Sequence, residues 1–276
     1  MDHKKTEVII MQIAPPKQLA CYIKHYIFLE NSKDAVKKLR LFADGNTGLI
    51  ISSDIHMQDD SDQYLPLSFF YGQPTQYKNL TTKGTFSLLA VVFQPYFFNL
   101  LFDVSAKEIK NEIISASDIV KEQLMPFQES LYKKEDPQSI IMALNAYFFQ
   151  LISKKRNQDS WLIQAQQYML QNKGALSLKE LEHFTGYSER HIERKFEDHI
   201  GISPKKYNTI LRLHHFLSLM KNNTDYQTMT GISYEAGYFD QSHLIREFKN
   251  TIGLTPNQYL KTENKLAVNF IELPYH

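Results

Sequence analysis

Residues 231–259, GISYEAGYFDQSHLIREFKNTIGLTPNQY, predict a short helix, a tight turn, a second helix and the start of a third. Gly237 stands in the turn, where a residue that tolerates positive φ is favoured. Asp240 is the expected N-cap of the second helix, over residues 240–251, and Gly253 ends that helix. The buried face of this helix is expected to hold Leu244, Phe248 and Ile252. The stretch therefore predicts a helix-turn-helix unit.

The same pattern occurs once more, at residues 181–207, LEHFTGYSERHIERKFEDHIGISPKKY. The turn glycines Gly186 and Gly237 lie 51 positions apart, whereas the cap glycines Gly201 and Gly253 lie 52 positions apart. The second copy therefore has one extra residue, in its turn. Repeats that stack as solenoids need three or more units, so two units joined by one helix predict a bipartite reading module.

The exposed face of the second helix carries amide, hydroxyl, aliphatic and guanidinium groups, which suit the edges of base pairs in a major groove. The candidate DNA-binding residues of this unit are Gln241, Ser242, His243, Ile245 and Arg246. Those of the first unit are Glu189, Arg190, Glu193 and Arg194. The candidate phosphate contacts are Lys205, Lys206, Lys249 and Asn257.

Several of these side chains have a second interpretation. Arg194 either binds a guanine bidentately, at roughly 1–3 kcal/mol of discrimination, or contacts a phosphate, or pairs with Glu197 or Asp198. Glu193 either accepts a hydrogen bond from cytosine or is a solvated charge that repels phosphate. The lysines either contact phosphates or are simply solvated. Two helical hairpins in an ordinary bundle are the alternative for the twin motif as a whole.

The pair of units resembles the DNA-binding domain of the AraC/XylS family of bacterial transcription regulators, over residues 161–261. The residues that carry the resemblance are Gly237-Tyr238-Phe239-Asp240-Gln241-Ser242-His243, Arg246, Phe248-Lys249, Gly253, Thr255-Pro256 and Tyr259. The resemblance implies a sequence-specific, double-stranded DNA-binding regulator, such as an activator, with RNA polymerase as a further partner. It also implies that two recognition helices reach adjacent major-groove segments roughly 34 Å apart.

The N-terminal part predicts a small antiparallel β barrel or sandwich, because short apolar runs are separated by turn-rich links. The expected strands lie at residues 7–14, 25–30, 67–71 and 86–93, and a hairpin is expected over residues 40–52. The expected helices lie at residues 96–102, 117–132 and 137–156, with a further helix start at residues 105–108. The fold class is therefore two domains, an α+β domain followed by an all-α domain.

Segments 43–51 and 93–102 are similar to the N-terminal domain of one branch of the AraC-like regulators. The similarity implies a cupin-like module that senses a small-molecule effector or forms a homodimer. The charged run at residues 154–159 marks the expected boundary. The domains are thus expected at residues 1–156 and 157–265. Within the second domain, we expect the first helix-turn-helix at 177–201, the linker helix at 204–221 and the second helix-turn-helix at 228–253.

Composition argues against several other classes of protein. Thirty-one Lys and Arg against 30 Asp and Glu give a net charge of +1, so attraction to phosphates must come from local arrangement and helix N-termini. No apolar run approaches the ~20 residues of a membrane helix, and the first residues lack a signal peptide, which predicts a cytoplasmic protein. No phosphate loop, nucleophile elbow or HExxH motif is present, so no catalytic residue and no cofactor is expected.

Metal and thiol chemistry are expected to be absent as well. Cys21 is the single cysteine, which excludes an internal disulfide and argues strongly against a zinc-dependent repair methyltransferase. Cys21 is expected in the core, with a redox sensor as the alternative. Six histidines are interpreted as packing or surface residues rather than metal ligands: His183, His191, His199, His214, His215 and His243. The alternative function is a DNA-binding module fused to an enzymatic or sugar-binding N-terminal domain.

Overall fold

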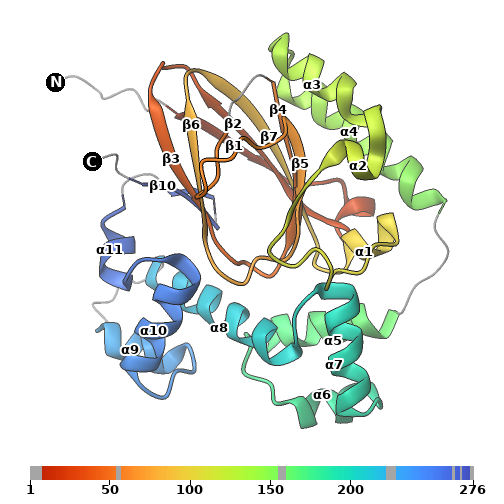
Figure 1. Cartoon of the computed structure of the whole chain (residues 1–276). Coiled ribbons are helices and arrows are strands. Elements are labelled where there is room, and N and C mark those ends of the chain that lie inside the picture. Colours follow the sequence, from red (N-terminus) through yellow and green to blue (C-terminus); the bar gives the residue numbers. More distant parts are fainter. Residues whose placement is uncertain are drawn as a thin grey trace.

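The computed structural model describes residues 8–53, 57–154, 160–221, 228–262, 265–267 and 269–273. Figure 1 shows a β domain above a layer of helices, with further helices along one flank of the sheets. The expected two-part architecture, antiparallel β followed by all-α, is confirmed.

The β domain consists of two antiparallel sheets that face each other (Figure 1). The six-stranded sheet has the order β1-β2-β7-β4-β5-β8, with bounds Val8–Ile13, Ile23–Asn31, Phe86–Phe93, Thr47–Ser52, Ser68–Tyr71 and Ile113–Ser115. The four-stranded sheet has the order β6-β3-β10-β9, with bounds Lys78–Lys83, Val36–Leu41, Phe270–Leu273 and Lys265–Ala267.

Strand β7 is almost wholly apolar because both of its faces are buried. Successive side chains of a strand point to opposite faces. Accordingly, Leu88 and Val92 join the core between the two sheets, whereas Leu89 and Phe93 join the core under the helices. The expectation of a buried strand at residues 86–93 is confirmed.

Short helices cover the outer face of the six-stranded sheet. They are η1 (Lys17–Leu19), α1 (Phe97–Phe102), α2 (Ala116–Val120), η2 (Lys121–Leu124), α3 (Met125–Tyr132) and α4 (Pro137–Ser153). Phe148 of α4 packs edge-on against Phe93, with ring centres 5.6 Å apart, which fixes this helix on the sheet. The helix expected at residues 117–132 is interrupted, because Lys121 adopts a φ of 53° between α2 and α3.

Three expectations about the N-terminal part are wrong. Strands β3 and β4 do not form a hairpin but lie in different sheets, because the chain crosses between the sheets at residues 42–46 to bury Phe42 against the helical layer. Residues 105–108 form turns instead of starting a helix, since the backbone of Ala106 is hydrogen bonded to the helical layer. Cys21 is exposed rather than part of the core.

The helical layer contains α5 (Ser160–Gln171), α6 (Leu178–Thr185), α7 (Glu189–Ile200), α8 (Pro204–Lys221), α9 (Met229–Glu235), α10 (Gln241–Ile252) and α11 (Pro256–Leu260). The pairs α6–α7 and α9–α10 lie toward opposite ends of α8, which crosses beneath the sheets (Figure 1). Both helix-turn-helix pairs and the linker helix between them are therefore present.

The final strands β9 and β10 were not expected from the sequence. After α11 the chain returns to the β domain, where β10 lies between β3 and β9. The pairing places Phe270 opposite Leu41 and Ile271 opposite Arg40. Lys37 Nζ lies 2.7 Å from Glu272 Oε1 in a largely buried ion pair that ties the two strands together. We refer to residues 265–273 as the C-terminal tail.

Candidate nucleic-acid interface

Capping residues define the starts of α7 and α10, the second helices of the two helix-turn-helix units. Ser188 accepts a hydrogen bond from the His191 amide at the start of α7, and Asp240 accepts one from the His243 amide, 2.7 Å away, at the start of α10. In the helix before α7, Ser177 and Glu180 form a reciprocal capping box. Hydrogen bonds from Ser177 lower the pKa of Glu180, so its carboxylate stays charged at this helix N-terminus.

Matching apolar stripes anchor α7 and α10. These stripes are Ile192, Phe196 and Ile200 on α7, and Leu244, Phe248 and Ile252 on α10, all buried. Each stripe packs against an aromatic ring of the central helix α8. Phe248 meets Phe216 edge-on at 6.1 Å between ring centres, and Phe196 meets Tyr207 at 6.2 Å. Because the stripes are equivalent, the opposite faces of the two helices are equivalent too.

Most of the candidate DNA-binding residues lie on these opposite faces. The exposed ones are Arg190, Glu193, Arg194, Gln241, Ser242, Ile245 and Arg246, and the half-buried ones are Glu189 and His243. Among the candidate phosphate contacts, Lys205, Lys249 and Asn257 are exposed and Lys206 is half-buried. Lys206 lines a polar recess of about 350 Å³ beside Lys107 and Lys110 of the β domain.

Some candidate side chains already have partners inside their own unit. The Gln241 amide donates a hydrogen bond to the Thr230 hydroxyl of α9, so binding to a base would compete with this contact. The guanidinium of Arg194 lies 3.4 Å from His191 Nδ1, and His243 Nε2 lies 3.4 Å from Glu247. Arg246 therefore differs from Arg194 in its surroundings, although the two occupy equivalent positions.

Two aromatic features of this surface were missed by sequence reasoning. Phe239, in the turn of the second unit, is 90% exposed. In the first unit, Tyr187 stacks on His191 with ring centres 4.8 Å apart and lies 4.7 Å from the ring of Trp161. An aromatic residue is buried by default in sequence reasoning, so only the position of Phe239 beside an exposed N-cap could have indicated its exposure.

The β domain contacts α7 and α10 at their C-terminal ends. The Ala106 amide donates a hydrogen bond of 2.9 Å to the Asp198 carbonyl of α7. Arg40 Nη1 donates to the Ile252 carbonyl of α10 over 3.1 Å, and its guanidinium lies 4.1 Å from the ring centre of Tyr77. The N-terminal halves of α7 and α10, which carry the candidate base contacts, stay accessible.

The central helix α8 is also fixed to the β domain. His214 Nε2 lies 2.8 Å from the Ala43 carbonyl oxygen, and Phe42 stacks on the His214 ring with centres 6.1 Å apart. Burial lowers the pKa of His214, which keeps its imidazole neutral at this junction. The segment at residues 42–46 thus connects the β domain to α8, the helix between the two helix-turn-helix units.

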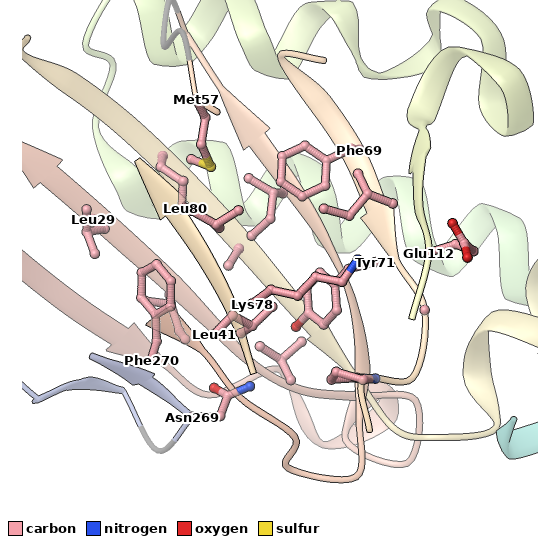
Figure 2. Close-up of a pocket in the computed structure, with 18 of the residues that line it drawn as sticks. Leu29, Leu41, Met57, Phe69, Tyr71, Lys78, Leu80, Glu112, Asn269 and Phe270 are labelled. Atoms are coloured by element: carbon pink, nitrogen blue, oxygen red, sulfur yellow. The ribbon is translucent and has the colours of Figure 1, made fainter. Parts of the chain in front are cut away.

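An apolar cavity of about 40 Å³ lies between the two sheets (Figure 2). Its walls include Met57, Phe69, Leu80 and Phe270, and Lys78 and Glu112 are its charged lining residues. Within the part of the chain that the structure describes, no group of three or more His, Cys, Asp and Glu residues could hold a metal ion. No helix among the same residues is long and apolar enough to cross a membrane.

Comparison with known proteins agrees with this geometry. Residues 181–262 match a family described as a helix-turn-helix domain, and residues 11–115 match a domain of unknown function (DUF6597). An uncharacterized HTH-type transcriptional regulator of Haemophilus influenzae is 33% identical over 85 residues, which make up 31% of this chain and 28% of the relative. A similar regulator of Staphylococcus aureus strain MSSA476 is 33% identical over 84 residues, 30% of this chain and 11% of the relative. The present chain therefore spans less than a third of the length of either relative.

A solved structure of ToxT from Vibrio cholerae with a bound unsaturated fatty acid aligns over 94% of this chain and 97% of its own, at 10% identity and a TM-score of 0.46. A probable AraC family regulator from Rhodopseudomonas palustris aligns over 37% of this chain and 96% of its own, at 24% identity and a TM-score of 0.35. The family match over residues 181–262, together with the twin motif, identifies this part of the chain as a helix-turn-helix domain.

Proposed function

We propose that the chain is a sequence-specific transcription regulator that reads two adjacent major-groove segments of duplex DNA with α7 and α10. The observation that carries this proposal is the equivalence of the two helices. Each is anchored by a matching buried stripe and presents polar side chains on its accessible N-terminal half. Helix N-termini also attract phosphate, which compensates for the nearly neutral net charge of the chain.

Roles follow for the candidate residues. Arg246 and Arg194 are assigned to guanine, Gln241 to adenine, and Ile245 and the exposed ring of Phe239 to apolar contact with thymine methyl groups. The lysines at the helix ends are assigned to phosphates, which position the protein without reading sequence. No catalytic step is proposed, and RNA polymerase is a further expected partner. A DNA target implies a cytoplasmic location in a bacterial cell.

The domain limits remain part of the proposal. Residues 157–265 form the DNA-binding domain, and residues 1–156 form a cupin-like domain through which an effector or a second copy of the chain modulates binding. Binding of an effector or of a second copy to the β domain can affect DNA binding, because the β domain contacts the C-terminal ends of α7 and α10. The cavity between the sheets is the candidate effector site.

The first test is specificity. A duplex enriched from a random pool by the full chain should be bound at least about a thousandfold more tightly than a scrambled duplex at physiological salt. A fragment starting at residue 158 should keep a preference for the enriched sequence, because it holds both reading helices and α8. Equal affinity of the folded full chain for enriched and scrambled duplexes contradicts the proposal.

Self-association is expected through α4. This 17-residue helix contains no charged residue, and its outward side exposes Met142 by 71% and Phe149 by 39%. A second copy related by a two-fold axis would cover this surface with its own α4. Met142→Glu should then convert dimers to monomers in sedimentation velocity. Ile9→Glu, at an exposed apolar position on edge strand β1, is the matched control and should leave the dimer intact. The opposite pattern places the interface on β1.

A further inference from the structure

The C-terminal tail forms part of the wall of the apolar cavity. Asn269 and Phe270 line it together with side chains from both sheets, such as Phe69 of β5 and Leu80 of β6 (Figure 2). The tail therefore follows the helical layer in sequence but lies in the interior of the β domain in space. Whatever occupies the cavity touches the tail directly.

Asn269 brings an unused hydrogen-bond donor to this cavity. Its side chain is 1% exposed, and its Nδ2 has no hydrogen-bond partner among the residues that the structure describes. A buried amide without a partner destabilises the fold relative to a paired one. The rest of the lining is mainly aliphatic and aromatic, and its other polar side chains are Tyr71, Lys78, Asn111 and Glu112. Lys78 and Glu112 carry opposite charges, so the lining has no net charge to compensate the lost hydration of an ionic ligand.

We propose that the cavity binds a small, uncharged, mainly apolar molecule with a single hydrogen-bond acceptor, such as a short-chain ketone, aldehyde or ester, whose carbonyl oxygen accepts from Asn269. This proposal rests on the proposed function, in which the β domain senses an effector. The enclosed volume of about 40 Å³ is well below the roughly 150 Å³ that holds benzene. Only the carbonyl and its nearest carbons fit inside, and the rest of the ligand extends toward the rim.

A ligand held by Asn269 would also stabilise the docked tail. Strand β10 is hydrogen bonded to β3, with Ile271 opposite Arg40. Arg40 in turn donates to the Ile252 carbonyl at the end of reading helix α10. Occupancy of the cavity is thereby linked to the position of the second reading unit through two strands and one side chain. The same linkage predicts that DNA binding and ligand binding influence each other reciprocally.

The test compares 2-butanone with 2-methyl-1-butene, which replaces the carbonyl oxygen by a methylene group and keeps the shape. The probe of binding is the ¹³C-labelled methyl group of Met57, which is buried in the cavity wall and is assigned with a Met57→Leu variant. The ketone should shift this resonance saturably and bind about five- to tenfold more tightly than the alkene, the range expected for one buried hydrogen bond.

Two variants distinguish the contribution of the Asn269 hydrogen bond from that of the cavity volume. Asn269→Leu should bring the ratio of the two affinities close to one, whereas Ala90→Leu should fill the cavity and abolish both shifts. Saturating ketone should also slow hydrogen exchange of the backbone amides of β10. No saturable shift, equal affinities in the unmodified chain, or a shift that survives Ala90→Leu overturns the proposal. DNA binding is measured separately on the unliganded chain, so a failure of the regulator function is distinguishable from a failure of the ligand assignment.

Discussion

Arg246→Ala lowers the affinity of the full chain for its enriched duplex by about 10- to 100-fold, equivalent to roughly 1–3 kcal/mol. Arg246 is exposed on α10, in a unit whose candidate contacts include no acidic residue. Arg194→Ala has a smaller effect, because its guanidinium already lies 3.4 Å from His191 and shares its helix face with Glu193. The measurement is a binding titration of both variants against the enriched duplex and its single-base mutants.

Arg246→Lys is the matched control. Lysine keeps the charge that a phosphate contact needs but loses the bidentate geometry that guanine recognition needs. If Arg246→Lys binds as tightly as the unmodified chain at every base position, Arg246 is a phosphate contact. In the first unit, Glu193→Ala should raise nonspecific affinity and relax base preference at one position. Unchanged values for both would identify Glu193 as a solvated charge and refute its role in base recognition.

Gly201→Ala destabilises the chain by roughly 2–4 kcal/mol, more than Gly186→Ala, which costs about 1–2 kcal/mol. Both glycines end helices with positive φ, 89° and 73° respectively, so both variants incur the same left-handed strain. They differ in their surroundings. A Cβ at Gly186 meets nothing within 4 Å, whereas a Cβ at Gly201 would lie 2.7 Å from the Ala106 carbonyl oxygen.

The difference between the free energies of unfolding of the two variants therefore measures the contact between the β domain and the end of α7. Denaturant unfolding of each variant gives its free energy of unfolding. Hydrogen exchange should also quicken in the Ala106 amide of Gly201→Ala, because that amide is bonded to Asp198 in the same contact. Equal destabilisation by the two substitutions would mean that the β domain and α7 separate freely in solution.

The helix-turn-helix units could be predicted because their signals are local. An N-cap such as Asp240, a stop such as Gly253 and a four-residue apolar spacing all act within one or two helical turns. The buried strand β7 was also predictable, since a continuous apolar run needs burial on both faces. The base contacts assigned to Gln241 and Arg246 stay predictions.

What the sequence could not predict depends on contacts between distant residues. The segment at residues 42–46 has the composition of a hairpin turn, and only its packing on α8 makes it a crossing between sheets. The 90% exposure of Phe239 is indicated only by its place beside an exposed N-cap, a signal too weak against the usual burial of phenylalanine. The tail alternates apolar and polar residues weakly over a few positions, too few to indicate a strand whose partner, β3, lies near the start of the chain.

Lys37 and its partner Glu272 are 235 positions apart. During synthesis, β3 therefore leaves the ribosome long before β10 exists. At a synthesis rate of about 5–20 residues per second, more than ten seconds pass before β10 is available to pair with β3. Throughout that interval the four-stranded sheet has an open edge at β3, of the kind to which unrelated strands add. The β domain is completed only after both reading units have emerged, so a nascent chain that stalls between α8 and the tail presents an unfinished sheet to chaperones and proteases.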